Sequence, residues 1–300
     1  MDESRAAMKK SNFLPIGLAM ALLSGMAASP AAPASPPAPP PSRIISLAPS
    51  ITEILYGLGV LDRVVGRTDF CDYPPQVKSI LSVGGWLNPN LERLIALKPD
   101  LAILMKAQDL TLENKLHDLK IPFLEVPMES VADVRAAILS IGDAVGRKGD
   151  AARLVRDVDA AFANTRKKAA RFPRKKVLFV VGRTPGSLQG IFVAGRETFM
   201  DEVLNAAGGD NVAHDRVKGY ANLSPEAVIA LNPDVILEVQ ESEKRSEDLL
   251  RDWAPLTSVT AVRNHAIFTI HDEVVEPPSQ RITQALKLVF DLLHPGPAMP

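Results

Sequence analysis

A nine-residue segment that occurs twice is the feature that most constrains the fold of this chain. Residues 92–100 (ERLIALKPD) and 226–234 (EAVIALNPD) are identical at six positions. Asn90 and Ser224, two residues before the glutamates, are favoured helix N-caps, and an apolar, strand-like run follows each copy. A spacing of 134 residues is too wide for a solenoid, whose periods are about 20–50 residues. The repeat therefore predicts two similar α/β lobes with a ligand cleft between them.

The N-terminus has the features of a secretory signal. Lys9 and Lys10 precede an apolar run at 13–28 that proline and glycine interrupt and that is shorter than the ~20 residues of a spanning helix. We expect residues 1–28 to be a cleaved signal peptide, with an uncleaved anchor as the alternative. Residues 29–42 are rich in proline and alanine, and such a composition predicts an extended linker.

The single cysteine and the net charge limit the possible cellular location and binding partners of the protein. Cys71 is the only cysteine, so no intramolecular disulfide is possible. It lies far from the signal and so cannot be the lipidated residue of a lipoprotein. We therefore expect a periplasmic protein without a lipid anchor. The net charge of −1 argues against a nucleic-acid partner, which usually requires a basic surface.

The rest of the chain divides into four parts. Residues 43–148 alternate strand-like and helical patterns, which predicts an N-terminal lobe with a parallel sheet. Residues 149–173 form a bridging helix that ends at Pro173, residues 174–294 form the C-terminal lobe, and 295–300 are a tail. The predicted class is α/β, with two Rossmann-like lobes bridged by one long α-helix.

Three segments resemble the periplasmic cobalamin-binding proteins of ABC importers: Tyr73-Pro-Pro75, residues 84–101 and Ser224-Pro-Glu226. More broadly, they resemble the helical-backbone metal-receptor superfamily, which also includes haem and ferric-siderophore receptors. The resemblance extends from Arg43 to about Leu293 and implies capture and delivery rather than catalysis. It implies a monomer with a corrinoid ligand, no cofactor, an importer permease with its ATPase as partner, and membrane contact only through that permease. Haem or a ferric siderophore is the alternative ligand.

An exported two-domain α/β enzyme is the alternative from another class. The sequence contains no Gly-x-Ser-x-Gly elbow and no Walker loop, and this absence counts against it.

The resemblance also implies which side chains line the cleft. Flat aromatic rings bury a corrin with little loss of entropy, and an acid contacts the ligand. The implied ligand-binding residues are Phe70, Trp86, Met105, Phe192, Tyr220 and Glu273. For Phe192, a place in the core of a strand is the alternative. Pro277 stands where the family has a basic residue, and this departure leaves the identity of the corrinoid open.

Glu92 and Glu226 are the strongest candidates for partner contacts. An acid in the first turn of a helix favours the helix dipole, which is an alternative explanation for either residue alone. Their equivalent positions in the two lobes favour the role that the resemblance implies, in which each docks onto an arginine of the permease.

The histidines do not predict a metal site, because their spacings match no ligand motif: His117, His214, His265, His271 and His294. His214 and His271 lie in loops near the predicted cleft, where they either contact the ligand metal or are solvated. We expect Arg281, at the start of the closing helix, to be structural.

Overall fold

The computed structural model describes residues 39–106, 110–240, 246–271 and 275–295. The expected signal peptide and most of the expected linker lie outside these residues. Residues 40–300 belong to one compact unit. Within the described ranges, no helix combines the length and the apolar character needed to cross a bilayer.

The first sheet is parallel throughout, with the strand order β2-β1-β3-β4. Its strands are apolar and short, as expected for strands covered on both faces. They are β1 (Ile44–Ser46), β2 (Val64–Arg67), β3 (Leu101–Met105) and β4 (Phe123–Val126). This sheet agrees with the parallel arrangement that the sequence pattern predicts for the N-terminal lobe.

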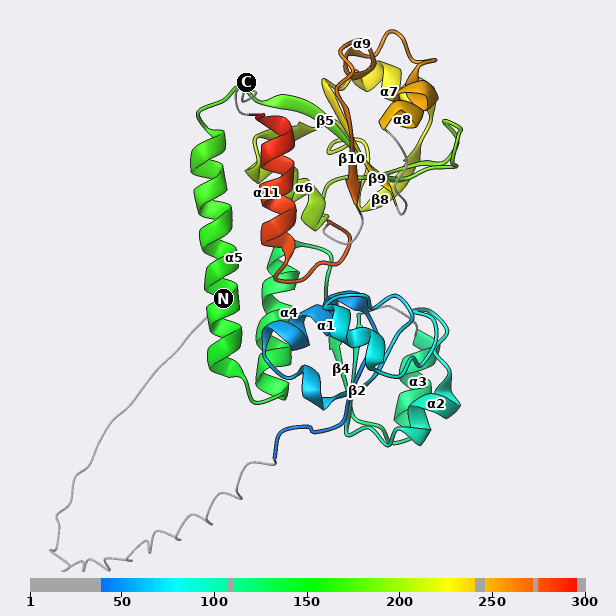
Figure 1. The fold of residues 1–300 in the computed structure, drawn as a ribbon, viewed down its shortest axis with the longest axis vertical. Coiled ribbons are helices and arrows are strands. Elements are labelled where there is room, and N and C mark those ends of the chain that lie inside the picture. The colour runs from blue at the N-terminus through cyan, green and yellow to red at the C-terminus, as the bar shows by residue number, and fades with distance from the viewer. Residues whose placement is uncertain (1–38, 107–109, 241–245, 272–274, 296–300) are drawn as a thin grey trace, which may run out of the picture. The chain divides into compact units, whose positions relative to one another are not determined.

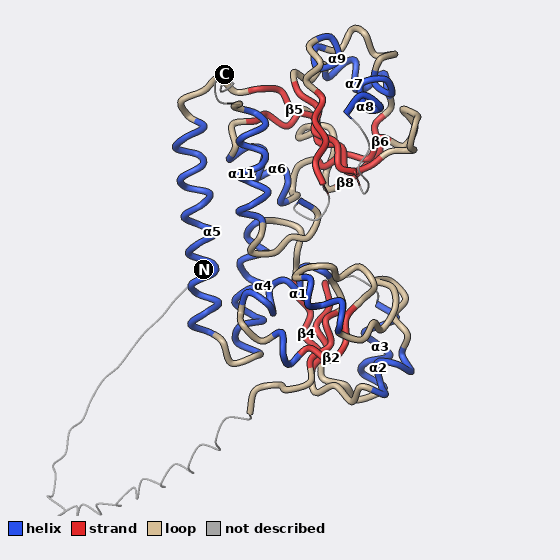
Figure 2. The backbone as a smooth tube through the Cα atoms, viewed as in Figure 1, coloured by secondary structure: helices blue, strands red, loops and turns tan. Residues whose placement is uncertain are grey.

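Helices cover both faces of the first sheet (Figures 1 and 2). One core packs side chains of α1 (Pro49–Gly57) and α4 (Val131–Ala144) against the strands. The core on the other face includes side chains of α2 (Leu91–Ala96) and α3 (Leu110–Asp118). Two short 3₁₀ helices, η1 (Leu61–Arg63) and η2 (Pro75–Ser79), occupy the connections.

The long helix α5 (Lys148–Ala169) lies where the bridging helix is predicted. Its 22 residues span about 33 Å. Ala151, near its start, belongs to a core of the first lobe, whereas Val158 and Phe162 belong to a core of the second. Figure 1 shows α5 beside α4 and α11. Gly142 permits the close approach of α4, because a Cβ there would lie 2.3 Å from the Cβ of Ala151.

The second sheet is mixed rather than wholly parallel. Its strands lie in the order β10-β9-β5-β6-β8, and β7 pairs with β5. The pairs β5–β6 and β6–β8 are antiparallel, whereas β5–β9, β5–β7 and β9–β10 are parallel. The strands are β5 (Lys175–Gly182), β6 (Ile191–Ala194), β7 (Gly209–Asn211), β8 (Tyr220–Leu223), β9 (Val235–Gln240) and β10 (Ile267–His271).

Two groups of helices enclose the second sheet. On one face, α6 (Phe199–Ala206) and α11 (Ile282–Leu293) pack with α5. On the other face, the core takes side chains from three helices: α7 (Pro225–Leu231), α8 (Ser246–Trp253) and α9 (Thr260–Arg263). Each sheet is therefore the middle layer of its own lobe.

The last residues of the repeat fasten each lobe's first strand. The carboxylate of Asp100 accepts hydrogen bonds from the N–H groups of Ser42 and Arg43, each 2.8 Å long, and that of Asp234 accepts one of 2.9 Å from Lys176 N–H. Burial raises the pKa of Asp100, but these backbone donors outweigh it and lower the pKa overall. The Pro-Asp part of the repeat therefore has a structural role in both lobes.

Candidate functional site

The largest described hollow that contains predicted ligand residues is a cavity of about 470 Å³, called here the first pocket. It combines loops of the first lobe with the segment that precedes α11. Its lining is mostly apolar and aromatic, with four carboxylates: Pro49, Ser50, Glu53, Asp69, Phe70, Asp72, Tyr73, Trp86, Met105, Glu276, Pro277 and Pro278. A pocket of this size and composition suits a small-molecule ligand.

Trp86 reaches the first pocket from a tight loop. Gly84 adopts a φ of 101°, which favours glycine, and pairs with Pro89 across the loop. The indole packs against the core of the first lobe. Phe70, by contrast, is 62% exposed. The pocket therefore has one aromatic side chain held by the core, Trp86, and one whose ring is open to solvent, Phe70. Met105 lines the pocket from the last position of β3.

A buried polar cluster links the first pocket to α11. Glu53 is 2% exposed and accepts hydrogen bonds from Ser279 Oγ and from Arg281 Nη1, the latter 2.5 Å long. The Arg281 guanidinium also stacks on the Tyr73 ring, 3.7 Å from its centroid. Burial raises the pKa of Glu53 more than these partners lower it. Arg281, expected to be structural, thus connects two segments that form the pocket wall.

A second pocket, of about 290 Å³, belongs to the other lobe. Its wall contains Phe192 and Tyr220, whose rings are stacked with centroids 5.9 Å apart and an interplanar angle of 28°. Phe192 faces this hollow from β6 and is not buried in the core. Glu276 lines both pockets, so the two hollows are neighbours.

The charged side chains that line the pockets are all acidic, although Arg281 pairs with Glu53 and Lys78 lies 3.6 Å from the carboxylate of Asp72. Glu53, Asp69, Asp72 and Glu276 line them, and among the described lining residues of either pocket there is no lysine, arginine or histidine. Burial, followed by the charges of Glu276 and Glu129, raises the pKa of Tyr220. The walls therefore offer carboxyl oxygens as hydrogen-bond acceptors, together with a phenol whose pKa is raised.

The structure divides the predicted ligand residues between these two pockets. Phe70, Trp86 and Met105 line the first, and Phe192 and Tyr220 the second. Glu273 and the side chain of His271 lie outside the described residues. Pro277, where the resemblance implies a basic residue, lines the first pocket.

The four pocket carboxylates were missed by the sequence analysis. Asp69 and Asp72 flank Phe70 in the sequence, a signal that could have been used. Glu53 has no such signal, because it lies inside an apolar helix.

Glu92 and Glu226 lie in the first turns of α2 and α7 and are exposed. The predicted N-caps are confirmed: Asn90 Oδ1 accepts a hydrogen bond from Arg93 N–H at 2.9 Å, and Ser224 Oγ accepts one from Ala227 N–H at 3.3 Å. A hydrogen bond with Ser224, assisted by the backbone N–H of Glu226 itself, lowers the pKa of Glu226. Neither glutamate lines a pocket described above.

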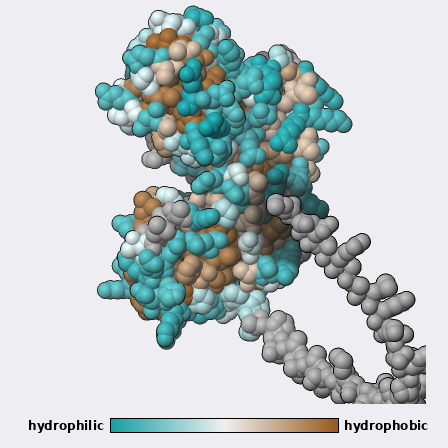
Figure 3. Space-filling view, turned by 180° about the vertical axis from the view of Figure 1, so that it is seen from behind, coloured by the Kyte–Doolittle hydropathy of each residue, from teal (hydrophilic) through white to brown (hydrophobic). Residues whose placement is uncertain are grey.

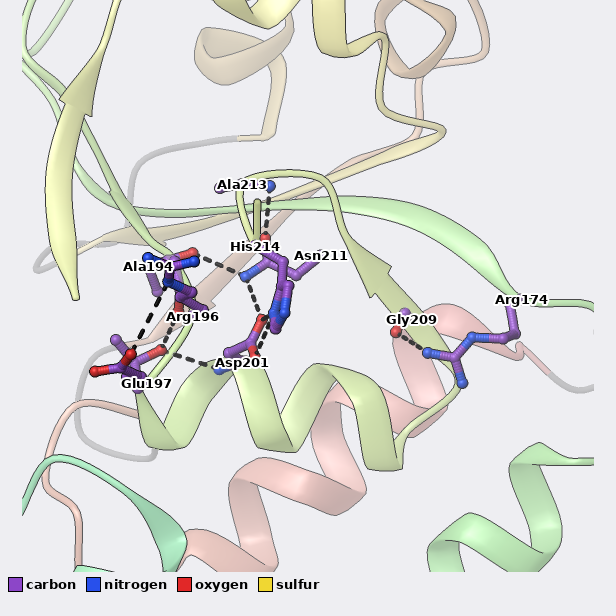
Figure 4. Close-up of polar contacts among 11 residues, drawn as sticks. Arg174, Ala194, Arg196, Glu197, Asp201, Gly209, Asn211, Ala213 and His214 are labelled. Carbon is purple, nitrogen blue, oxygen red and sulfur yellow. Dashed lines mark hydrogen bonds and ion pairs between the residues drawn. The ribbon is translucent and has the colours of Figure 1, made fainter. Parts of the chain in front are cut away.

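His214 is paired within the second lobe rather than placed at either pocket. Figure 4 shows its ring directed at Asp201 on α6, with Nδ1 2.9 Å from Oδ2. Asp201 also accepts a hydrogen bond of 2.8 Å from the side chain of Asn211. Among the residues that can be described, no cluster of three or more histidine, cysteine or acidic side chains could hold a metal ion.

Comparisons with known proteins agree with this architecture. Residues 44–274 match the periplasmic binding protein family. A Bacillus subtilis (strain 168) protein, the uncharacterized ABC transporter substrate-binding lipoprotein YvrC, is 30% identical over 262 residues, which cover 85% of this chain and 81% of that protein. The vitamin B12-binding protein of Pectobacterium atrosepticum is 26% identical over 228 residues, covering 74% and 80%.

One similar solved structure is that of a protein named for haem binding. The periplasmic heme-binding protein RhuT from Roseiflexus sp. RS-1, in its apo form, is 30% identical with a TM-score of 0.74. The match covers 84% of this chain and 99% of that one. Similarity therefore extends over nearly all of the two-lobed part of the chain but includes relatives named for different ligands.

Proposed function

Because the chain belongs to the periplasmic binding protein family, we propose that it captures a corrinoid such as cobalamin and delivers it to the permease of an ABC importer. Members of this family serve transport, so the alternative of an exported enzyme is wrong. The proposal includes a periplasmic location without a lipid anchor, since the lone Cys71 is buried in the first lobe. The relatives support substrate binding for import, and the choice of ligand depends on the pockets.

The aromatic walls support a large, flat ligand. Phe70 and Trp86 come from the first lobe, and Phe192 and Tyr220 from the second. Flat side chains bury apolar ring surface at low entropic cost. A corrin is a disc with an apolar face and a polar edge, so rings on both sides can cover its faces while the carboxylates meet its edge.

The observation that carries the choice of a corrinoid is the sign of the wall charge. Cobalamin and cobinamide have amide groups around the corrin, and their N–H donors can pair with the carboxylates of Asp69, Asp72 and Glu276. Haem has two propionates. Two like charges about 5 Å apart repel by about 3 kcal/mol at an effective dielectric of about 20. An acidic wall therefore favours amides over carboxylates.

Haem is the second candidate because RhuT, named for haem, is similar over the same length. A tyrosine can ligate haem iron as a phenolate. In Tyr220, which lines the second pocket, burial and nearby acids raise the pKa of the phenol in the absence of iron. The acidic lining is the observation that supports a corrinoid over haem in this proposal.

Titration of the mature protein with matched ligands tests the proposal. We expect cyanocobalamin and cobinamide to bind one-to-one in calorimetry and to raise the melting temperature, since a ligand of the folded form stabilises it by mass action. Cobyrinic acid, a corrin whose side chains are carboxylates, is the matched control and should bind far more weakly at neutral pH. A response to haemin or to a ferric hydroxamate, with none to the corrinoids, would contradict the proposal.

Delivery is assigned to the two repeat helices. Glu92 and Glu226 are exposed at equivalent positions on α2 and α7, away from the pocket linings. A carboxylate can accept paired hydrogen bonds from an arginine. Two equivalent acids, one in each lobe, suit a permease whose two halves present the same basic residue.

A further inference from the structure

The two repeat helices expose more than a glutamate. Ile95 is 44% exposed and Ile229 is 41% exposed, although both are large apolar residues. They occupy the same repeat position, three residues after Glu92 and Glu226, and an exposed alanine follows each. Residues three and four apart lie on one face of an α-helix. Each helix thus presents an outward Glu-Ile-Ala surface, called here the repeat face.

The lobes do not use these isoleucines for their own packing. The inward side of α2 is formed by Leu94 and that of α7 by Val228, each fully buried. Isolated exposed apolar residues are common. Figure 3 shows apolar surface on both lobes, and other large apolar side chains, such as Phe70 and Phe172, are also exposed. What distinguishes Ile95 and Ile229 is that an exposed isoleucine recurs beside an exposed acid in both copies of the repeat.

We infer that Ile95 and Ile229 are docking residues that shield the two carboxylates from water when the protein meets its permease. This inference rests on the docking function proposed above. A charged pair gains strength when neighbouring apolar groups exclude water from it. The partner chemistry is therefore specific. Each half of the permease presents a guanidinium beside a small apolar hollow, and the two halves are related by a two-fold axis.

The repeat face favours the permease over other occupants by its charge. Its acidic groups would meet repulsion at an anionic lipid surface, and two copies of this protein would bring carboxylate against carboxylate. A cationic partner would attract these carboxylates, whereas a lipid surface or a second copy of the protein would repel them. The two equal faces also match a partner with two equal halves.

Association with the importer's permease–ATPase complex, reconstituted in nanodiscs, tests the inference. Compared with the unaltered protein, the Ile95→Ser/Ile229→Ser variant should bind about tenfold more weakly, and each single variant less so. Ligand affinity and melting temperature should stay unchanged. Leu139→Ser is the matched control, because Leu139 is 46% exposed in the first lobe outside the repeat, and it should bind normally. Ile95→Val/Ile229→Val should retain most of the affinity.

The salt dependence separates shielding from simple apolar contact. If the isoleucines shield the ion pairs, the serine variant should lose affinity more steeply than the unaltered protein as salt rises, because an exposed pair is screened more. An unchanged salt slope with weaker binding would overturn shielding. Normal binding by the serine variant would overturn the docking role of the isoleucines. If the unaltered protein bound nanodiscs that contain no permease, and the serine variant did not, the isoleucines would be lipid-contacting residues instead.

Failure of this inference can be told from failure of the proposed function. If Glu92→Ala/Glu226→Ala abolishes association but the serine variant does not, docking through the glutamates stands and only the isoleucines are excluded. If neither double variant affects association, the repeat helices are not the docking surface.

Discussion

Glu53 and Arg281 form a buried ion pair although 228 residues separate them in the sequence. Glu53 belongs to α1 in the first lobe, and Arg281 stands at the start of α11. Ser279 donates a second hydrogen bond to the same carboxylate, and Gln280 donates one of 2.7 Å to the backbone carbonyl of Glu53. Residues 279–281, which follow the pocket residues Glu276–Pro278, therefore attach this wall of the pocket to the first lobe through Glu53.

Glu53→Ala should destabilise the protein strongly. Removing one partner leaves the charge of Arg281 buried and unpaired, which typically costs about 3–5 kcal/mol. The free energy of unfolding, measured with urea and circular dichroism, should fall by about that amount. The double variant Glu53→Ala/Arg281→Leu should recover part of the loss, because no unpaired charge remains. Equal losses in both variants would show that the pair is not what stabilises this contact.

The pH dependence of stability should carry the signature of Glu53. Its folded-state pKa lies above the ordinary value, so folding favours the protonated form. The stabilisation is complete below the ordinary carboxyl pKa and is lost as the pH rises through the raised folded pKa. Compared with Glu53→Gln, the unaltered protein should therefore become less stable by up to about 1.4 kcal/mol per pH unit within that window. If the free energy of unfolding of the unaltered protein and of Glu53→Gln changed in parallel with pH, the raised pKa of Glu53 would be contradicted.

The aromatic residues of the two pockets should both contribute to affinity. Trp86→Ala and Tyr220→Ala should each weaken corrinoid binding by about 1–3 kcal/mol, the scale of a lost buried aromatic contact. Phe172→Ala is the control, since Phe172 is an exposed aromatic outside the pockets, and its affinity should not change. Calorimetry gives the constants. If only one of the two pocket variants lost affinity, the ligand would contact a single lobe.

The wall charge should determine the choice between ligands. Asp72→Lys places a cation in the lining of the first pocket, where it repels no amide but attracts a propionate. Haemin binding should strengthen severalfold, because the variant removes a repulsion and adds an attraction, each of about 1 kcal/mol or less at this exposed position. Cobinamide binding should weaken because its amides lose a carboxylate acceptor. Asp118→Lys makes the same change in net charge at an exposed site outside both pockets and should leave the preference unchanged. Rising salt should reduce the effect.

Local sequence signals predict much of the fold. The repeat predicts the caps at Asn90 and Ser224, and both are confirmed. The glycine break and the apolar spacing between Val131 and Arg171 predict two helices, which are α4 and α5. The mixed second sheet was not predicted, because the loop between β5 and β6 gives a weak hairpin signal and antiparallel pairing depends on which strands become neighbours.

The site is less predictable than the fold because its parts meet through distant contacts. Trp86 could be identified from its loop, but the lining by Glu53 and Glu276 depends on how α1 and the segment before α11 come together. The pairing of His214 with Asp201 likewise joins a loop to α6. No local periodicity encodes such meetings, so the acidic character of the pocket walls emerges only from the three-dimensional structure.

Glu92 and Glu226 should be needed for delivery of the ligand to the permease but not for its capture. Both carboxylates are exposed and neither lines a pocket, so Glu92→Ala/Glu226→Ala should bind cobinamide with unchanged affinity. Import into proteoliposomes containing the permease–ATPase complex should fall sharply, because each truncation leaves a buried partner arginine unpaired, at a cost of about 2–5 kcal/mol. Each single variant should retain one docking contact and show a smaller defect.

The matched control for this experiment is Glu197→Ala, because Glu197 is another exposed acid of the second lobe that lies outside the repeat. It should transport normally. If the Glu92→Ala/Glu226→Ala variant instead lost ligand affinity, with import falling only in proportion, the glutamates would belong to capture. The repeat helices would then have to approach the ligand, which requires a rearrangement of both lobes from the arrangement described here.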